Sequence, residues 1–191
     1  EIGNWVLREA CRQCKLWHDL GYTELSVAVN VSAIQFKRGN IEEIVINALS
    51  NSGLQPQYLE IEMTESILID DSHVLMDALF RLRNLGIKFS IDDFGTGYSN
   101  LGYIKKFQVE ILKIDQSFIY KMSENSQDEA IVKAIIQMAS SMGIKTIAEG
   151  VENKYTRDKL AEMKCDMAQG YFCSKPITKN EMINYIRNFE N

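Results

Sequence analysis

The sequence contains little proline and little histidine, and it has no long apolar run. Only 2 prolines and 11 glycines occur among 191 residues, so neither a disordered tail nor a long linker is expected. No apolar stretch approaches the roughly 20 residues that a membrane-spanning helix needs, and the first residues do not resemble a signal peptide. With 46% hydrophobic and 25% charged residues, the composition predicts one globular domain over residues 1–191.

An excess of positive charge is also absent. The formal net charge is -5, whereas proteins that bind nucleic-acid polymers carry basic patches, so that class of partner is disfavoured. A small phosphate ligand stays possible, because divalent cations can lie between phosphates and an acidic site.

The four cysteines offer no convincing zinc site. Cys11 and Cys14 have CxxC spacing, which could indicate zinc or a disulfide, but their segment has a helical pattern. Cys165 and Cys173 do not form a second CxxC pair. Free thiols in a reducing compartment are therefore favoured, which predicts a cytoplasmic protein or the cytoplasmic part of a membrane-anchored one.

One unit recurs along the chain: an apolar run ends in a polar or acidic residue, and a loop and a helical pattern follow. The expected strands span residues 25–32, 58–65, 87–93, 110–115 and 144–150, with a weaker one at 165–170. Helical patterns occupy residues 41–50, 72–85, 126–142, 155–163 and 179–189, with Ser72 as a candidate cap and Gly143 as a stop.

Strands that alternate with helices predict an α/β fold with a parallel sheet, either an open doubly wound sheet or a TIM-type (β/α) barrel. Polar residues follow almost every strand, and barrel active sites collect at that end, so we favour the barrel. Six strands are recognisable, so up to two of a barrel are missing or cryptic.

The segment from Ile2 to Leu20 has apolar residues at helical spacing, namely Trp5, Val6, Ala10 and Leu16. Such a helix needs an element to pack against, and the chain begins with Glu rather than Met. We therefore expect a fragment of a longer protein, with a barrel that is incomplete at its N-terminus.

The strand ends carry the residues that could perform chemistry. In chain order they are Asn30, Glu62, Asp92, Asp93, Lys113, Asp115, Glu149 and Gln169. In a barrel these side chains converge on one mouth, and carboxylates so close together need protons or cations to neutralise them. Because all candidate ligands are oxygen donors and neither His18 nor His73 joins them, Mg²⁺, Mn²⁺ or Ca²⁺ is favoured over Zn²⁺.

Simpler explanations exist for each residue alone. An acidic residue after a strand is often a helix cap or turn former, and Lys113 could be a surface lysine with a buried stem. Repetition at successive strand ends argues against the first explanation, and the apolar neighbours of Lys113 argue against the second. An inward Glu62 is also costly to bury without a partner.

A glycine-bearing loop follows Asp93. It comprises Phe94, Gly95, Thr96, Gly97, Tyr98 and Ser99. It lacks the GK[ST] ending of a P-loop, and its DFG is not accompanied by the other kinase motifs. A loop that closes over bound metals is the better interpretation.

Together these motifs resemble EAL-domain cyclic di-GMP phosphodiesterases over almost the whole chain. The matching stretches are NVS at 30–32, EMTES at 62–66, DDFGTGYSNL at 92–101, KID at 113–115, AEGVE at 148–152 and QGY at 169–171.

The resemblance implies specific roles. Asn30, Glu62, Asp92, Asp93 and Gln169 would bind two Mg²⁺ or Mn²⁺ ions, with Asp92 as the bridging ligand. Lys113 and Glu149 would act on the attacking water, Glu65 would hold the loop after Asp93, and Asp115 would be the nearby catalytic aspartate. The implied reaction is hydrolysis of cyclic di-GMP to linear pGpG.

The chain also departs from the family pattern. The glutamate of the Glu-Ala-Leu motif and a ligand-binding arginine are expected before Glu1, so this piece could be inactive alone. A sensor, cyclase or membrane domain could also precede it, and the resemblance implies a homodimer. Cys173 stands where the family often has Phe, which we expect to alter packing only.

Two other functions are possible on the sequence alone. The first is a family member that binds cyclic di-GMP or a protein partner without hydrolysis, although such members usually lose metal ligands that are intact here. The second is an unrelated barrel hydrolase, which the DDFGTGYSNL loop disfavours.

Overall fold

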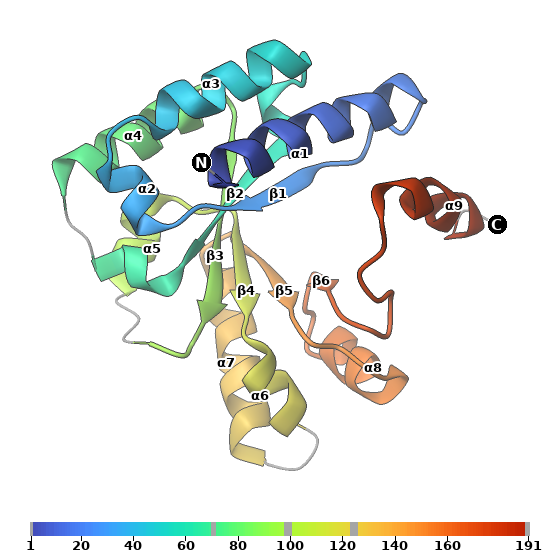
Figure 1. Ribbon diagram of the computed structural model, residues 1–191. Coiled ribbons are helices and arrows are strands. Elements are labelled where there is room, and N and C mark those ends of the chain that lie inside the picture. Colours follow the sequence, from blue (N-terminus) through green and yellow to red (C-terminus); the bar gives the residue numbers. More distant parts are fainter. Residues whose placement is uncertain (1, 70–71, 98–100, 123–125, 190–191) are drawn as a thin grey trace.

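The computed structural model describes residues 2–69, 72–97, 101–122 and 126–189. Six parallel strands form one sheet in the order β1-β2-β3-β4-β5-β6. The strands are β1 (Val27–Asn30), β2 (Leu59–Thr64), β3 (Lys88–Phe94), β4 (Ile111–Ile114), β5 (Lys145–Ala148) and β6 (Met167–Ala168). The sheet curls, and helices lie along its outer side (Figure 1), so the predicted α/β barrel class is confirmed.

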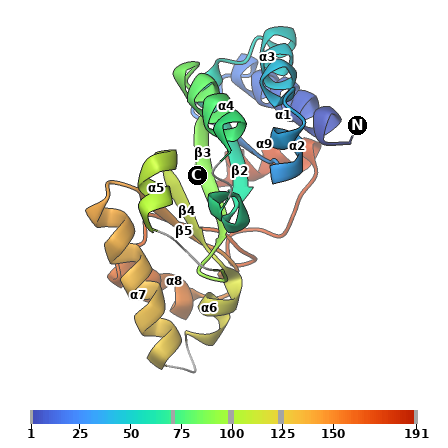
Figure 2. The ribbon, with the colours of Figure 1, turned by 90° about the vertical axis from the view of Figure 1, so that its left-hand side faces the viewer.

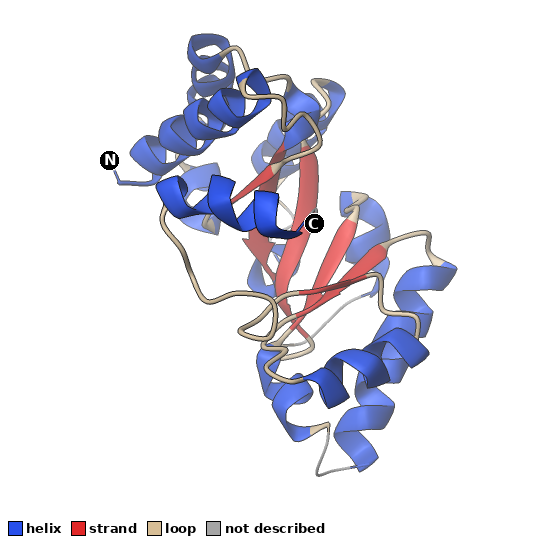
Figure 3. Cartoon of the chain, turned by 90° about the vertical axis from the view of Figure 1, so that its right-hand side faces the viewer, coloured by secondary structure: helices blue, strands red, loops and turns tan. Residues whose placement is uncertain are grey.

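Helices alternate with the strands along the chain, as the sequence pattern predicted. They are α1 (Ile2–Asp19), α2 (Ala33–Lys37), α3 (Ile41–Ser52), α4 (His73–Asn84), α5 (Leu101–Phe107), α6 (Gln116–Lys121), α7 (Ser126–Ser141), α8 (Lys154–Glu162) and α9 (Lys179–Phe189). Two 3₁₀ helices, η1 (Pro56–Tyr58) and η2 (Glu65–Ile69), flank β2. Figure 3 shows the helices around the strands. The short α2, α5 and α6 were not predicted.

Local signals at helix ends act as the sequence predicted. The Ser72 side chain accepts a hydrogen bond from the Leu75 amide at 3.3 Å, which caps α4. Gly143 follows α7 with φ at 73°, a left-handed conformation that glycine adopts without strain. These two residues fix where the helices begin and end.

Strand register separates the two faces of the sheet. Asn30 aligns with Glu62, and Glu62 with Ser90, while Ser90 aligns with Ile111 and Ile111 with Lys145. Because successive side chains alternate between faces, these residues share the inner face of the curl. The outer face carries the buried apolar residues, which pack against the helices.

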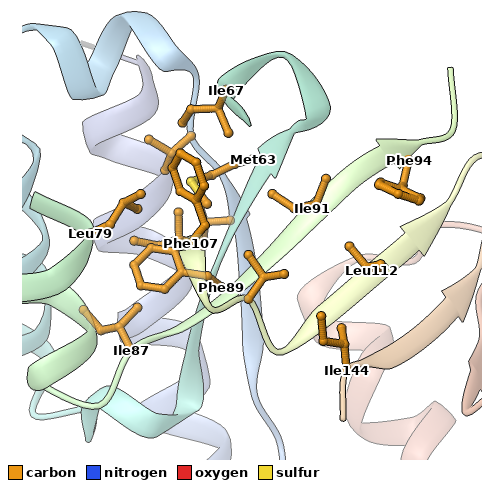
Figure 4. Packing of buried hydrophobic residues seen from close by; sticks show 14 of the residues in the cluster. Met63, Ile67, Leu79, Ile87, Phe89, Ile91, Phe94, Phe107, Leu112 and Ile144 are labelled. Atoms are coloured by element: carbon orange, nitrogen blue, oxygen red, sulfur yellow. The ribbon is translucent and has the colours of Figure 1, made fainter. Parts of the chain in front are cut away.

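The core lies between this outer face and the helices. Figure 4 shows Leu79 of α4 and Phe107 of α5 beside Met63 and Phe89 of the sheet. Phe89 is only 1% exposed. Burial of this kind contributes roughly 1.5–3 kcal/mol for each large side chain.

Most of the apolar residues noted in α1 are not the ones that pack. Trp5, Val6 and Leu16 are exposed, Ala10 is partly buried against the core, and the buried residues are Leu7, Cys11 and Cys14. Cysteine behaves as a small apolar residue when buried, so the stripe that packs contains the CxxC pair. Burial raises the pKa of both thiols to about 11, and all four cysteines are free.

Two other helices bury most of the apolar residues that recur at helical spacing in their sequences. In α4, Leu75, Leu79 and Leu82 are buried, and Val74 is exposed. In α7, Ile135 is buried and Met138 is partly buried against the core, whereas Ile131 is exposed. The periodicity therefore predicted the packed face of both helices, apart from one exposed residue in each.

Candidate acidic site at the carboxyl ends of the strands

The inner face presents its polar residues at the carboxyl ends of the strands. Asn30 and Glu62 align on β1 and β2, and Asp92 lies two residues beyond Ser90 on β3. Lys113 lies two residues beyond Ile111 on β4, and Glu149 follows β5 directly. A parallel sheet places all these ends at one edge, so the predicted convergence is observed.

Lys113 is the centre of this cluster. Its Nζ lies 3.1 Å from a Glu62 oxygen, 2.9 Å from Asp92 and 2.8 Å from Glu149. The residue is only 3% exposed, which rules out a surface lysine. We call Glu62, Asp92, Asp93, Lys113 and Glu149 the acidic site.

The lysine only partly neutralises its neighbours. Burial alone would lower the pKa of Lys113, but hydrogen bonds to Glu149 and Asp92 outweigh it and hold that pKa above its usual range. Burial raises the pKa of Glu62 and of Glu149, although Lys113 opposes the rise. More positive charge than one lysine supplies would therefore stabilise the ionised carboxylates.

A bulge in β3 brings the two aspartates together. The register between β3 and β4 shifts between Ile91 and Phe94, so β3 carries one more residue than β4 there. Asp93 has φ at 56°, a conformation that aspartate tolerates better than most residues. The pKa of Asp93 is raised by burial and by the nearby Asp92 and Asp115.

This geometry can hold a cation. Asp92, Asp93 and Glu149 each offer an oxygen, and these oxygens lie within 4.8 Å of one another. Oxygen ligands of this kind suit hard divalent metals, so the site is suited to divalent metal binding.

Glu65 holds the loop after Asp93. One of its carboxylate oxygens accepts hydrogen bonds from the amides of Gly95 and Gly97, both at 3.1 Å. A Cβ at Gly97 would lie 3.2 Å from the Glu65 carboxyl carbon, so glycine permits this close approach. Glu65 is 6% exposed. Phe94 is buried and Thr96 donates a hydrogen bond to the Asp93 carbonyl, while Tyr98 and Ser99 lie outside the described residues.

Asp115 has a different local environment. Its carboxylate accepts hydrogen bonds from the Ser117 amide at 3.0 Å and from the Ser117 hydroxyl, and it caps α6. The described contacts of Lys113 do not include it. The geometry therefore gives Asp115 a capping role at the start of α6, and its catalytic assignment stays a prediction.

Gln169 and Asn30 lie at the edges of the site and are exposed. Gln169 and Glu149 line a pocket of about 260 Å³. Gln116, Tyr120 and Tyr171 line the same pocket. The tyrosine hydroxyl of Tyr120 donates a hydrogen bond to Glu152 at 3.2 Å.

Sequence reasoning did not single out several of these residues. Gln116 and Glu152 adjoin motifs that were recognised, so their position beside KID and within AEGVE was an available signal. Ser90 was also missed: it is fully buried on the inner face, and its hydroxyl has no hydrogen-bond partner among the described residues. No pattern in the sequence marks that serine.

The chain is similar to a known family and to curated proteins. A family model described as "EAL domain" matches residues 1–176. The chain is 44% identical to the signaling protein YkoW of Bacillus subtilis over 97% of this chain and 23% of that relative. It is 40% identical to the bifunctional diguanylate cyclase/cyclic di-GMP phosphodiesterase MucR of Pseudomonas aeruginosa, over 96% of this chain and 27% of that relative. The chain thus spans about a quarter of the length of these curated relatives.

Solved structures agree with this comparison. The MucR phosphodiesterase in complex with c-di-GMP superposes with a TM-score of 0.91 at 40% identity, over 95% of this chain and 73% of that one. BlrP1 of Klebsiella pneumoniae, in a complex with calcium and cy-diGMP, superposes with a TM-score of 0.80 at 27% identity, over 91% of this chain and 44% of that one. The family match and the similarity to these proteins and structures lead to one conclusion: this chain belongs to the EAL domain family.

Proposed function

We propose that this chain is the catalytic domain, over residues 1–191, of a metal-dependent phosphodiesterase that hydrolyses cyclic di-GMP to linear pGpG. The observation that carries the proposal is the buried Lys113 in contact with Glu62, Asp92 and Glu149. Buried charge is costly unless it is paired, and grouped carboxylates with a lysine suit phosphate-ester chemistry. The described function of MucR supports the same reaction.

The proposed ligands are Asn30, Glu62, Asp92, Asp93 and Gln169. They would hold two Mg²⁺ or Mn²⁺ ions, which polarise the phosphate and lower the pKa of a bound water. Structures of BlrP1 with calcium and with manganese support divalent metal use. Oxygen atoms of two of these ligands, Asp92 and Asp93, and of the neighbouring Glu149 lie within 4.8 Å of one another, close enough for a metal ion to bind there.

The other residues would accept the proton of the attacking water or hold neighbouring segments in place. Lys113 and Glu149 are 2.8 Å apart, so together they can orient a water molecule and hold its proton. Glu65 fixes the loop through Gly95 and Gly97, and Asp115 caps α6 directly after Lys113 and Ile114 of β4. Phosphoryl transfer depends mainly on such positioning and on electrostatic stabilisation.

The direct test is hydrolysis of cyclic di-GMP with Mg²⁺ or Mn²⁺, followed by separation of pGpG. It is run on this chain and on a version that carries the upstream Glu-Ala-Leu strand expected from the resemblance. Activity of the extended version supports the proposal. If the extended version folds and binds the dinucleotide without cleaving it, the protein is a receptor, which is the second candidate function.

The resemblance also supports three proposals about the whole protein. We expect a homodimer, which light scattering of the purified protein would test. The free cysteines favour a reducing compartment, so we propose a cytoplasmic location, which fractionation would test. Among the described residues, no helix has the length and apolar character of a bilayer-spanning segment. We further propose that a sensor, cyclase or membrane domain precedes this chain, as the resemblance implies.

A further inference from the structure

A second pocket lies at the opposite end of the same strands. It has a volume of about 750 Å³, within the range of small-molecule sites in proteins. Its walls come from the starts of β3, β4 and β5 and from the ends of α4, α5 and α7. Figure 2 shows α5 on the same side of the molecule as β4 and β5.

The rim of this pocket is positively charged. Four cations line it, whereas the chain as a whole carries a net charge of -5. The cations are Arg83, Lys88, Lys105 and Lys145. We call this site the basic pocket.

The basic pocket also has one carboxylate in its lining, Glu110, which already has partners within the protein. Glu110 accepts a hydrogen bond from the Phe89 amide at 2.8 Å and lies 3.7 Å from Arg83. Glu60, on β2, is the register neighbour of Lys88, and the ion pairs of the described part of the chain do not join these two residues. Among the residues that the structure describes, Lys88, Lys105 and Lys145 have no ion-pair partner.

Two of the four cations lie at the ends of helices, and the other two lie at the starts of strands. Arg83 and Lys105 lie in the last turns of α4 and α5, where a positive charge favours the helix dipole. Lys88 and Lys145 instead begin strands β3 and β5, on the inner face to either side of Ile111. Both are exposed, so their charges are available to a ligand.

The floor of the basic pocket is apolar. Ile104, Ile111 and Ile144 line it and are less than one tenth exposed. A ligand that fills it must therefore have an apolar or aromatic body as well as negative charge, because free phosphate would leave the floor uncovered.

The backbone at the rim is strained. Gln108 has φ at 51° directly after α5, a position that usually carries glycine. Its side chain accepts a hydrogen bond from Arg83. Strain of this kind is often found where a binding site is held in shape.

We propose that the basic pocket is a second binding site, for an organic anion of nucleotide size with at least two negative charges. Lys88 lies four residues before Asp92 on the same strand, so the two sites are separated by roughly 13 Å of strand. Binding at the amino ends of β3 to β5 could therefore occur without contact with the acidic site.

Binding of trinitrophenyl-ATP, followed by its fluorescence and by competition with ATP, tests this proposal. The protein is kept in EDTA, so that phosphates cannot bind through metal ions at the acidic site. The test variant is Lys88→Gln/Lys145→Gln. The matched control is Lys133→Gln/Lys154→Gln, which removes the same charge from exposed lysines of α7 and α8.

We expect saturable binding that weakens with salt, an affinity at least about tenfold lower in the test variant, and less than a twofold change in the control. Met142→Trp, which places a larger side chain at the pocket wall, should weaken binding without a change of charge. No saturable binding, equal losses in test and control variants, or equally strong competition by inorganic triphosphate would overturn the proposal. Unchanged thermal unfolding of each variant confirms that the comparison concerns folded protein.

Discussion

The two ends of the sheet differ in charge and in how their lysines are used. At the carboxyl ends, carboxylates surround one buried lysine, Lys113, which contacts three of them. At the amino ends, Lys88 and Lys145 are exposed around an apolar floor. Both sets lie on the inner face of the same sheet, so distance along the strands, and not the face, separates the acidic site from the basic pocket.

This difference shows what burial demands. A lysine that loses water must gain partners, and Lys113 is surrounded by them. An exposed lysine keeps its hydration, so it needs no partner to be stable and can meet a ligand. Removing charges at each end should therefore have very different consequences.

The largest effect is expected at the acidic site. Asp92→Asn should reduce cyclic di-GMP hydrolysis on the order of 10³-fold or more, because it removes charge where the metals and the developing phosphate charge are expected. The measurement is the rate of pGpG formation with Mn²⁺. The substitution is made in a version of the protein that is active without it. Glu162→Gln, an exposed change on α8, is the control, and wild-type activity of Asp92→Asn would refute the ligand assignment.

The next effect concerns stability. In EDTA, Lys113→Met should lower the free energy of unfolding by about 3 kcal/mol, because Glu62, Asp92 and Glu149 lose their shared counter-charge. Urea unfolding measures this change, with Lys133→Met as the exposed control.

The free energy of unfolding of Lys113→Met should also depend on pH, and the pKa shifts of its neighbours give the direction of the change. Burial raises the pKa of Glu62 and Glu149 in the folded protein, so the folded state holds these protons more tightly than the unfolded state. As the pH falls from neutral, these carboxylates therefore bind protons first in the folded state, and the free energy of unfolding rises. The rise ends near the ordinary pKa of a glutamate, where the unfolded state binds the same protons. The rise should be larger in Lys113→Met than in the wild type between about pH 8 and about pH 5, and a pH-independent loss would contradict the charge explanation.

A smaller and more local effect is expected at Glu65. Glu65→Gln weakens two charge-assisted hydrogen bonds, which should cost about 1–2 kcal/mol. Hydrogen exchange of the Gly95 and Gly97 amides should accelerate about tenfold. If those amides kept their protection, Glu65 would not be what holds the loop.

The corresponding carboxylate at the amino ends, Glu110, should contribute still less to stability. Glu110→Gln keeps an acceptor for the Phe89 amide but loses its charge and its contact with Arg83, so the loss should be about 1 kcal/mol. Exchange of the Phe89 amide measures it, and a loss as large as that of Lys113→Met would remove the contrast between the two ends.

The smallest effect is expected for the exposed lysines. Lys88→Gln/Lys145→Gln should change the free energy of unfolding by no more than about 0.5 kcal/mol per site, because surface changes without partners rarely matter more. Chemical unfolding beside the wild type is sufficient, and a large loss would mean that these lysines stabilise the fold and are not available to a ligand.

Much of this structure was predictable from local patterns. Apolar runs followed by polar residues located all six strands, and Ser72 and Gly143 marked helix ends. These features depend on neighbours in the chain, so they can be predicted without knowledge of the rest of the molecule. The parallel order then placed Glu62, Asp92, Lys113 and Glu149 at one edge.

Other features depend on contacts between distant segments. Nothing near Trp5 in the sequence indicates that Leu7, Cys11 and Cys14, and not Trp5, face the neighbouring elements. The β3 bulge also depends on the pairing of β3 with β4. A helix of intermediate polarity offers several similar stripes, and only the arrangement of its neighbours selects one.

The sequence by itself determined the alternation of strands and helices, the family and the residues of the acidic site, because these follow from periodicity and from short motifs. Only the tertiary structure decided that one lysine is shared by three carboxylates, that Asp93 adopts a left-handed backbone, and that four cations from separate elements surround one pocket. Those facts depend on distances between residues far apart in the chain, which packing of the helices on the curled sheet establishes.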